Sequence, residues 1–182
     1  MAKLVSKTYG QALFELALEQ NALEQILEEE AFVKEVFAEN EELVTMLNHP
    51  KISKDEKIQV VENIFKDKIS DTMVGFLVIV VTKERYDELE HIFQYFEEKI
   101  REYKNIGVVS VTTAVELSDV QKEQLTKRLL EVTSFKQLEF KYTINPDVIG
   151  GMVLRIGDRV VDSSIRTQID QMAKSLSKIQ LS

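Results

Sequence analysis

Cysteine and tryptophan are absent from this chain of 182 residues, which holds only two prolines and six glycines. The absence of cysteine excludes a disulfide framework and any thiolate metal site, and it is compatible with a reducing compartment. The scarcity of proline and glycine favours long helices joined by short loops. Hydrophobic residues make up 44% of the chain and charged residues 30%, which is typical of a globular protein and not of a disordered one.

Long apolar runs are also missing. The longest, Met73–Val81, has nine residues, whereas a membrane-spanning helix needs about 20. Near the start of the chain, Glu15 and Glu19 interrupt the apolar core that a signal peptide would need. We therefore expect a soluble, intracellular protein that does not insert into a bilayer.

Motifs for catalysis and for cofactor binding are absent. The two histidines, His49 and His91, have no partner at metal-ligand spacing. The pair Gly150-Gly151 lacks the pattern of a phosphate-binding loop, and no nucleophile elbow occurs. Adjacent acids such as Glu28-Glu29-Glu30 are expected to form a solvated helix face. The sequence thus predicts no enzyme activity, no cofactor and no metal; a small enzyme remains as an alternative that would need activity without any partner.

Acidic charge is concentrated in one part of the chain. Residues 1–105 hold 13 Lys and Arg against 22 Asp and Glu, a balance of −9, whereas residues 106–182 hold 10 against 9, a balance of +1. A net charge of −8 argues against nucleic-acid binding, which depends on Lys and Arg at phosphates. A nucleic-acid or regulatory adaptor is the rival class, but the C-terminal part lacks a basic patch interleaved with aromatics.

Helical patterns fill residues 1–105. Ser53 with Glu56 makes a capping box, and the proline after His49 ends a helix. The expected helices cover residues 3–20, 22–38, 40–48, 53–66, 70–83 and 87–104. Six short helices in this length predict a mostly α protein that begins with a six-helix bundle.

The pattern changes after residue 105. The β-branched run 108–115 predicts a strand, and Ser118 begins a helix that reaches about Val132. Three further strands are expected at 138–144, 152–156 and 159–161, followed by a helix after Ser163-Ser164. Residues 106–182 are thus predicted to form a small α/β domain of order β-α-β-β-β-α.

Two of the predicted helices carry an unusually large apolar surface, and a small bundle encloses one such helix more easily than two. In 3–20 the polar residues form a single narrow stripe, and the run 73–81 has no polar face. A helix that is apolar all round must be buried. One interpretation is that the two helices together receive an amphipathic helix from a partner protein. The alternative is that both are core helices, or that 73–81 is a buried strand.

The segment 138–157, L-E-F-K-Y-T-I-N-P-D-V-I-G-G-M-V-L-R-I-G, resembles the signature of the delta subunit of F-type ATP synthases, the bacterial relative of the mitochondrial oligomycin-sensitivity-conferring protein. Residues 158–166 and the segment Tyr9-Gly10-Gln11-Ala12-Leu13-Phe14 are also similar, although Gly10 stands where this family usually has alanine. The signature positions that we interpret as structural are Asn145, Gly150, Gly151, Arg155 and Gly157.

The resemblance implies a non-catalytic stator subunit at the cytoplasmic face of the bacterial membrane. Its helical domain, residues 1–105, would bind the N-terminal helix of an alpha subunit of the catalytic head through helices one and five. Its C-terminal domain, residues 106–182, would bind the C-terminal part of the peripheral b stalk. The residues expected to contact the alpha helix are Tyr9, Ala12, Leu13, Phe76, Ile79 and Val80.

Overall fold

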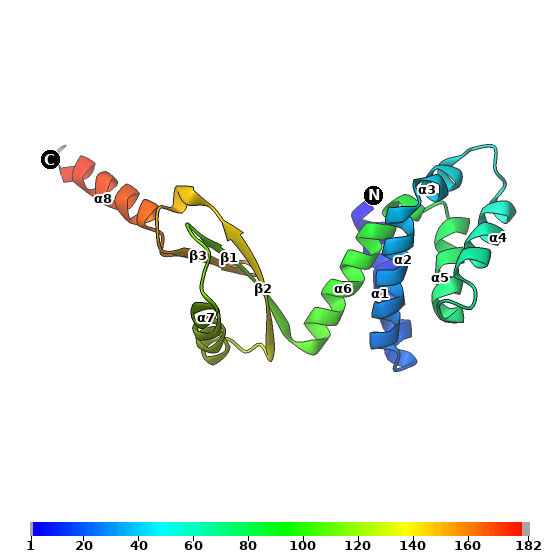
Figure 1. The fold of residues 1–182 in the computed structure, drawn as a ribbon, viewed down its shortest axis with the longest axis horizontal. Helices are drawn as coiled ribbons and strands as arrows, with labels where there is room; N and C mark the ends of the chain where they lie inside the picture. Colours follow the sequence, from blue (N-terminus) through cyan, green and yellow to red (C-terminus); the bar gives the residue numbers. More distant parts are fainter. Residues whose placement is uncertain (1, 180–182) are drawn as a thin grey trace. The chain divides into compact units, whose positions relative to one another are not determined.

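The computed structural model describes the backbone of residues 2–179 and the side chains of residues 4–173. The chain forms two compact units, residues 1–100 and 101–182, each with its own hydrophobic core. The first unit is helical and the second combines helices with a four-stranded sheet (Figure 1). The fold class predicted from the sequence, mostly α with a small C-terminal α/β part, is confirmed.

Helices of the first unit begin and end close to the predicted positions. They are α1 (Ala2–Glu19), α2 (Leu23–Glu39), α3 (Glu41–Asn48), α4 (Lys54–Phe65), α5 (Asp71–Thr82) and α6 (Leu89–Lys104), with a 3₁₀ turn, η1 (Tyr86–Glu88), before α6. The capping box of Ser53 and Glu56 is present at the start of α4. Because residues 73–81 lie inside α5, the buried-strand alternative is wrong.

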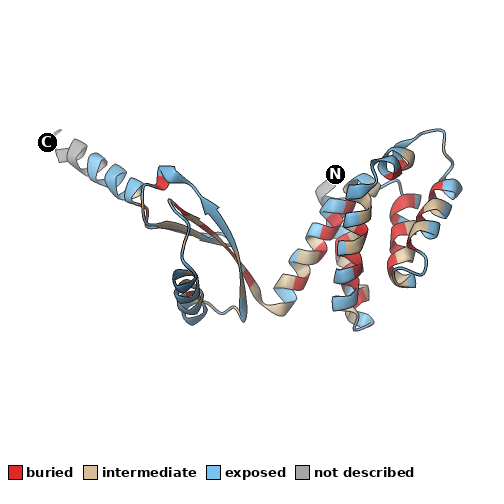
Figure 2. Ribbon diagram, in the orientation of Figure 1, coloured by how far each residue is buried: buried red, intermediate tan, exposed pale blue. Residues whose placement is uncertain are grey.

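The core of this unit is built around aromatic rings. Phe65 is fully buried; Phe32 packs edge-on against it at 6.3 Å between ring centroids, and Phe37 stacks on it at 6.2 Å. Figure 2 shows buried positions along the helices of this unit alternating with exposed ones. Truncation of a buried phenylalanine to alanine costs about 3–5 kcal/mol, so these rings contribute a large part of the stability of the bundle.

Glu29 and Glu30 are buried, so the prediction of a solvated face for Glu28-Glu29-Glu30 is wrong for two of the three residues. Three consecutive helical residues span about 200° and cannot share one face. Glu29 is held at the start of α5, where its carboxylate accepts hydrogen bonds from the backbone N–H of Ser70 (3.0 Å) and from the Ser70 hydroxyl (2.7 Å). Ser70 itself caps α5 by accepting from the N–H of Met73. A carboxylate near a helix N-terminus is stabilising.

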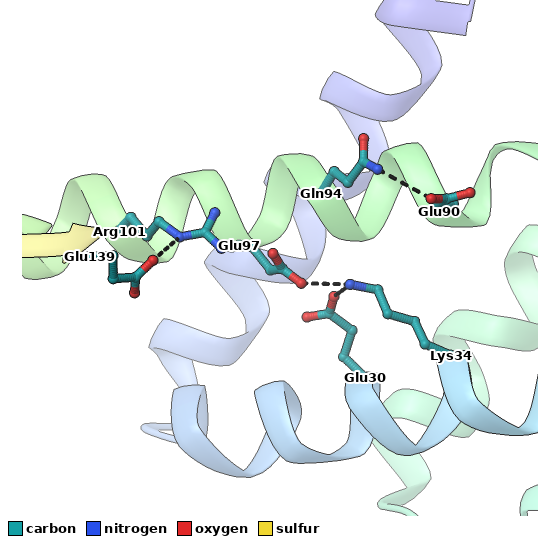
Figure 3. A network of polar contacts seen from close by, with 7 residues as sticks. All are labelled: Glu30, Lys34, Glu90, Gln94, Glu97, Arg101 and Glu139. Carbon is teal, nitrogen blue, oxygen red and sulfur yellow. Dashed lines mark hydrogen bonds and ion pairs between the residues drawn. The ribbon is translucent and has the colours of Figure 1, made fainter. Parts of the chain in front are cut away.

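Glu30 is the buried member of a group of three ionisable side chains between α2 and α6, whose other two members are partly exposed (Figure 3). Lys34 Nζ lies 2.6 Å from Glu30 Oε1 and donates a hydrogen bond of 2.5 Å to Glu97 Oε1. Glu30 is 1% exposed, and its Oε2 has no hydrogen-bond partner among the described residues. Burial raises the pKa of Glu30 to about 7, against the opposing effect of Lys34.

The second unit begins with a β-α-β element. Its elements are β1 (Ile106–Thr113), α7 (Asp119–Val132), β2 (Gln137–Ile144), η2 (Pro146–Val148), β3 (Met152–Ile156), β4 (Arg159–Asp162) and α8 (Ile165–Ile179). The sheet order is β2-β1-β3-β4, with β1 and β2 parallel and the other pairs antiparallel. Val109 and Val111 of β1 pack with Leu129 of α7 in a small core on one face of the sheet.

Candidate functional site

Within the described part of the chain, no three or more His, Asp or Glu side chains are grouped so as to hold a metal ion. None of the helices described is both long enough and apolar enough to span a bilayer. A pocket of about 590 Å³ lies among α2, α3, η1 and α6, but no residue that the sequence analysis selected lines it. The candidate sites are therefore apolar surfaces and the signature loop.

A hydrogen bond joins the end of α1 to the start of α5. The Thr72 hydroxyl donates to Gln20 Oε1 at 3.0 Å. Tyr9 and Leu16 lie on the same side of α1 as Gln20, because residues separated by four, seven or eleven positions share a helix face. By the same spacing, Ile79 lies on the side of α5 that carries Thr72. The contact at Gln20 therefore brings these two helix sides toward one surface.

We call this region the α1/α5 surface; its accessible members are Tyr9, Ala12, Leu16, Gly75 and Ile79. No charged residue is among them. Ile79 is 52% exposed, Ala12 and Gly75 are exposed, and Tyr9 and Leu16 are half-buried. Ile79 is the one large apolar side chain among these members that is exposed.

The six residues that the sequence selected for partner contact divide into three groups. Tyr9, Ala12 and Ile79 are accessible on the α1/α5 surface. Phe76 is 7% exposed and lies at the edge of the core. Leu13 and Val80 are 0% exposed and pack in the core, where a partner cannot reach them without rearrangement. Leu16 and Gly75 were not selected from the sequence, although a glycine inside a helix is a usable signal.

Two glycines inside helices have different surroundings. A β-carbon built on Gly10 would lie 2.7 Å from Cδ1 of Tyr95 and 2.9 Å from the carbonyl oxygen of Ile92, so glycine lets α6 approach α1 closely. A β-carbon on Gly75 would have no atom within 4 Å. The packing of this chain therefore explains Gly10 and leaves Gly75 unexplained.

The signature of the second unit surrounds the start of α8. A β-carbon on Gly150 would lie 2.8 Å from Cδ1 of Ile165, and one on Gly151 only 2.4 Å from the carbonyl oxygen of Ser163. Gly151 also has a φ of +74°, which side chains disfavour. The N–H of Ile165 donates to the carbonyl of Gly150 at 3.0 Å. The two glycines thus let the η2–β3 loop lie directly against the first turn of α8.

Other signature residues fix the neighbouring turns. Asn145 Oδ1 accepts from the N–H of Asp147 and begins η2. Gly157, with a φ of +55°, allows the turn between β3 and β4, and Arg155 Nε donates to its carbonyl at 3.3 Å. These contacts lie within the chain and hold the turns at both ends of β3 in place.

Asp162 holds Ser164, which caps the start of α8. Its Oδ1 accepts from the N–H of Ser164 at 2.9 Å, and its Oδ2 accepts from the Thr167 hydroxyl at 2.7 Å. The hydrogen bonds from Ser164 and Thr167 lower the pKa of this carboxyl. The N–H of Thr167 in turn donates to the Ser164 hydroxyl, at 3.2 Å. These contacts hold the first turn of α8 to the end of β4.

Comparisons with known proteins identify similar chains over nearly the whole length. The family model described as "ATP synthase delta (OSCP) subunit" matches residues 5–176. The ATP synthase subunit delta of Lachnoclostridium phytofermentans is 56% identical over 181 residues and covers 100% of both chains. That of Chlorobium chlorochromatii is 34% identical, covering 95% of this chain and 96% of its own. Among solved structures, a chain of the Toxoplasma gondii mitochondrial ATP synthase hexamer has a TM-score of 0.68 at 20% identity, covering 94% of this chain and 96% of its own, and supports the fold alone.

Proposed function

Because the chain belongs to the ATP synthase delta (OSCP) subunit family and is thus a subunit of the F-type ATP synthase, we propose that it links the catalytic head to the peripheral stalk. The first unit binds the N-terminal helix of an alpha subunit, and the second binds the C-terminal part of the b stalk. The protein does no chemistry and works as a peripheral component at the cytoplasmic face of the membrane. The head-binding part of this proposal rests on the α1/α5 surface, where Ile79 is half-exposed.

The role is mechanical. Rotation of the central shaft exerts an opposite torque on the head, and a head that turned freely would dissipate the proton gradient without making ATP. The link must therefore outlast many turnovers. We take a dissociation constant of about 1 nM as the scale of such a link, which corresponds to a binding free energy of about −12 kcal/mol.

The chemistry of the α1/α5 surface fits an amphipathic helix. Ile79 and Leu16 offer apolar side chains that are only partly covered by this chain, while Leu13 and Val80 support the surface from the core. Complete burial of an isoleucine stabilises by about 1.5–3 kcal/mol, so Ile79 and Leu16 account for part of the required free energy, and the apolar side chains of the partner helix supply the rest. Ala12 and Gly75, which are small, leave room for a helix backbone to come close.

Calorimetry tests this proposal with the full chain and a synthetic peptide of the alpha-subunit N-terminus. Ile79→Asp places a charge on the α1/α5 surface and is expected to weaken binding by about 30-fold or more. Val160→Asp is the matched control, because Val160 is exposed in the other unit. Absence of binding by the wild-type chain would refute the head-binding role, and equal binding by the Ile79 variant would show that the peptide docks elsewhere.

A further inference from the structure

The pocket among α2, α3, η1 and α6 shares no residue with the α1/α5 surface. Its volume of about 590 Å³ lies within the range of about 300–1,000 Å³ that is usual for small-molecule sites. Four of its lining side chains are apolar and enclosed: Val33, Leu47, Leu89 and Phe93. The walls therefore belong in part to the packed core of the helical unit, so the pocket is formed before any ligand arrives.

The charged residues of the lining are Lys34, Asp87 and Glu90. The ammonium of Lys34 is balanced by carboxylates, since its Nζ lies 2.6 Å from Glu30 Oε1 and 2.5 Å from Glu97 Oε1 (Figure 3). Asp87 and Glu90 are exposed, and neither forms an ion pair with a described residue. The uncompensated charge at the pocket is therefore negative.

Two contacts near the pocket agree with a negative field there. Glu90 accepts a hydrogen bond of 3.3 Å from Gln94, whose amide is neutral and leaves the charge of the carboxylate in place (Figure 3). In η1, burial and next the charge of Asp87 raise the pKa of the Tyr86 hydroxyl. A field that disfavours the phenolate favours a cation at the same place.

Aromatic rings supply the second part of the recognition. Phe37, Tyr86 and Phe93 line the pocket. Ammonium groups of this chain already lie near two of these rings, with Lys34 Nζ 5.8 Å from the centroid of Phe93 and Lys57 Nζ 5.6 Å from that of Tyr86. Among the described residues, no cation lies over Phe37. An aromatic ring attracts a cation to its face and also packs against an apolar body.

The balance stays negative when Lys57 is included. Asp87, Glu90 and Glu97 outnumber Lys34 and Lys57 even if Glu30 holds its proton. An anionic ligand would meet the two unpaired carboxylates, and a hydrophilic cation would leave the apolar walls in contact with water. A ligand that is apolar over most of its surface and carries one positive charge fits both parts of the lining.

We propose that this pocket binds a small organic cation, an amine or onium ion whose apolar body lies against the enclosed side chains and whose charge lies near Asp87 and Glu90. Such a ligand contacts α2, α3 and α6 together and stabilises the helical unit, because it binds the folded state alone. The inference does not depend on the proposed function.

Calorimetry of the full chain with tetraphenylphosphonium and with tetraphenylborate, in a sodium buffer at neutral pH, tests the proposal. The two ions have nearly the same shape and apolar surface and differ in the sign of their charge. We expect the phosphonium to bind with a dissociation constant on the order of 10 μM and at least about ten-fold more tightly than the borate. The phosphonium should also raise the thermal midpoint.

One pair of double variants tests the charge. Asp87→Asn with Glu90→Gln should weaken binding of the phosphonium by about five-fold, because both carboxylates at the pocket become neutral. Glu123→Gln with Glu131→Gln removes the same number of charges at exposed positions of α7 and should change binding by less than about two-fold. An equal loss in both double variants would attribute the preference to the overall charge of the protein and overturn the proposal.

A second pair tests the place of binding. Ala38 is an exposed residue of the lining, so Ala38→Trp puts a large side chain into the pocket with little effect on the core and should weaken binding by about ten-fold or more. Ala31→Trp, exposed on the same helix outside the lining, should bind like the wild type. Circular dichroism checks that both variants are folded.

The remaining outcomes each decide against the site. Absence of phosphonium binding by the wild type, or equal affinity for the two ions, refutes a cation pocket. Unchanged binding by folded Ala38→Trp places the ligand elsewhere on the protein. The alpha-subunit peptide takes no part in these measurements, so failure of the head-binding role would leave this inference standing, and failure of this inference would leave the head-binding role standing.

Discussion

Replacement of Glu30 by glutamine is expected to flatten the pH dependence of the stability of the helical unit. Glutamine keeps the size of the side chain and removes the titrating group, while Lys34 keeps its hydrogen bond to Glu97. Burial raises the pKa of Glu30 from 4.5 to about 7. The folded state therefore binds this proton more tightly than the unfolded state. The resulting stabilisation is complete below pH 4.5 and is lost as the pH rises through 7.

The magnitude follows from the difference between the two pKa values. The step from a pKa of 4.5 to a pKa of about 7 corresponds to roughly 3 kcal/mol for the whole transition. Between pH 5 and pH 8 the change in the free energy of unfolding amounts to roughly 2–3 kcal/mol, since part of the transition lies below pH 5. Glu30 is almost completely enclosed, so screening by solvent reduces this figure little.

Urea unfolding followed by helical circular dichroism at pH 5, 6, 7 and 8 measures this change. The free energy of unfolding of the wild type should fall relative to that of Glu30→Gln as the pH rises. Glu28→Gln, at an exposed position of the same helix, controls for the loss of one negative charge. Parallel pH profiles for the wild type and Glu30→Gln, within about 0.5 kcal/mol, would refute the assignment of Glu30 as a desolvated carboxyl.

Three other substitutions separate the roles described above. Gly75→Ala should raise the free energy of unfolding by up to about 1 kcal/mol and weaken binding of the alpha-subunit peptide; unchanged binding would contradict close approach at this glycine. Ser70→Ala should cost about 1–2 kcal/mol in urea unfolding, because it removes the cap of α5 and a partner of Glu29, whereas Thr82→Ala, exposed on the same helix, should cost less. Asp162→Ala should lower the thermal midpoint at neutral pH, and the difference should shrink as the pH falls through the lowered pKa of Asp162; a constant difference would exclude its carboxylate as the cause.

Helix and strand positions were largely predictable because local signals mark their ends. Ser53, Ser70 and Ser118 each accept a hydrogen bond from the backbone of the following turn, as the capping patterns predict. The alternation of residues 138–144 and the turn at Gly157 likewise gave β2, β3 and β4. These signals depend on neighbouring residues in the sequence, so that a single sequence contains them.

The burial of Glu29 and Glu30 could have been found and was missed. With Ile26 and Val33 they follow the spacing i, i+3, i+4, i+7 of a core-facing helix side, and all four are buried. The spacing predicts that these two residues are buried, whereas their residue type predicts exposure, because Glu is rarely buried without a partner. The partner of Glu29, Ser70, lies 41 residues on, and this contact depends on the tertiary fold. The partner of Glu30, Lys34, lies four residues on in the same helix, where the spacing allows an ion pair.

The accessible side of α5 could not be predicted. A run that is apolar throughout has no polar side to mark the surface, so Ile79 and Val80 looked equivalent although one is half-exposed and the other enclosed. The positive φ of Ile149 was equally hidden, since β-branched residues normally avoid it. The exposure of Ile79 and the backbone conformation of Ile149 both depend on long-range packing, which a single sequence does not contain.

The proposed linking role places a physical demand on each binding surface, because flexibility at a contact reduces both affinity and stiffness. Ordering a mobile side chain on binding costs about 0.5–1.5 kcal/mol, so a surface held in place by its own core binds more tightly for the same contact area. Ile79 sits beside Val80, which is enclosed in the core, and the first turn of α8 is held by Asp162 and by the approach of Gly151 to Ser163. The contacts of the signature residues thus stiffen the base of α8. Under the proposed function, variants at Gly151 should therefore weaken binding of the b stalk through altered placement of α8.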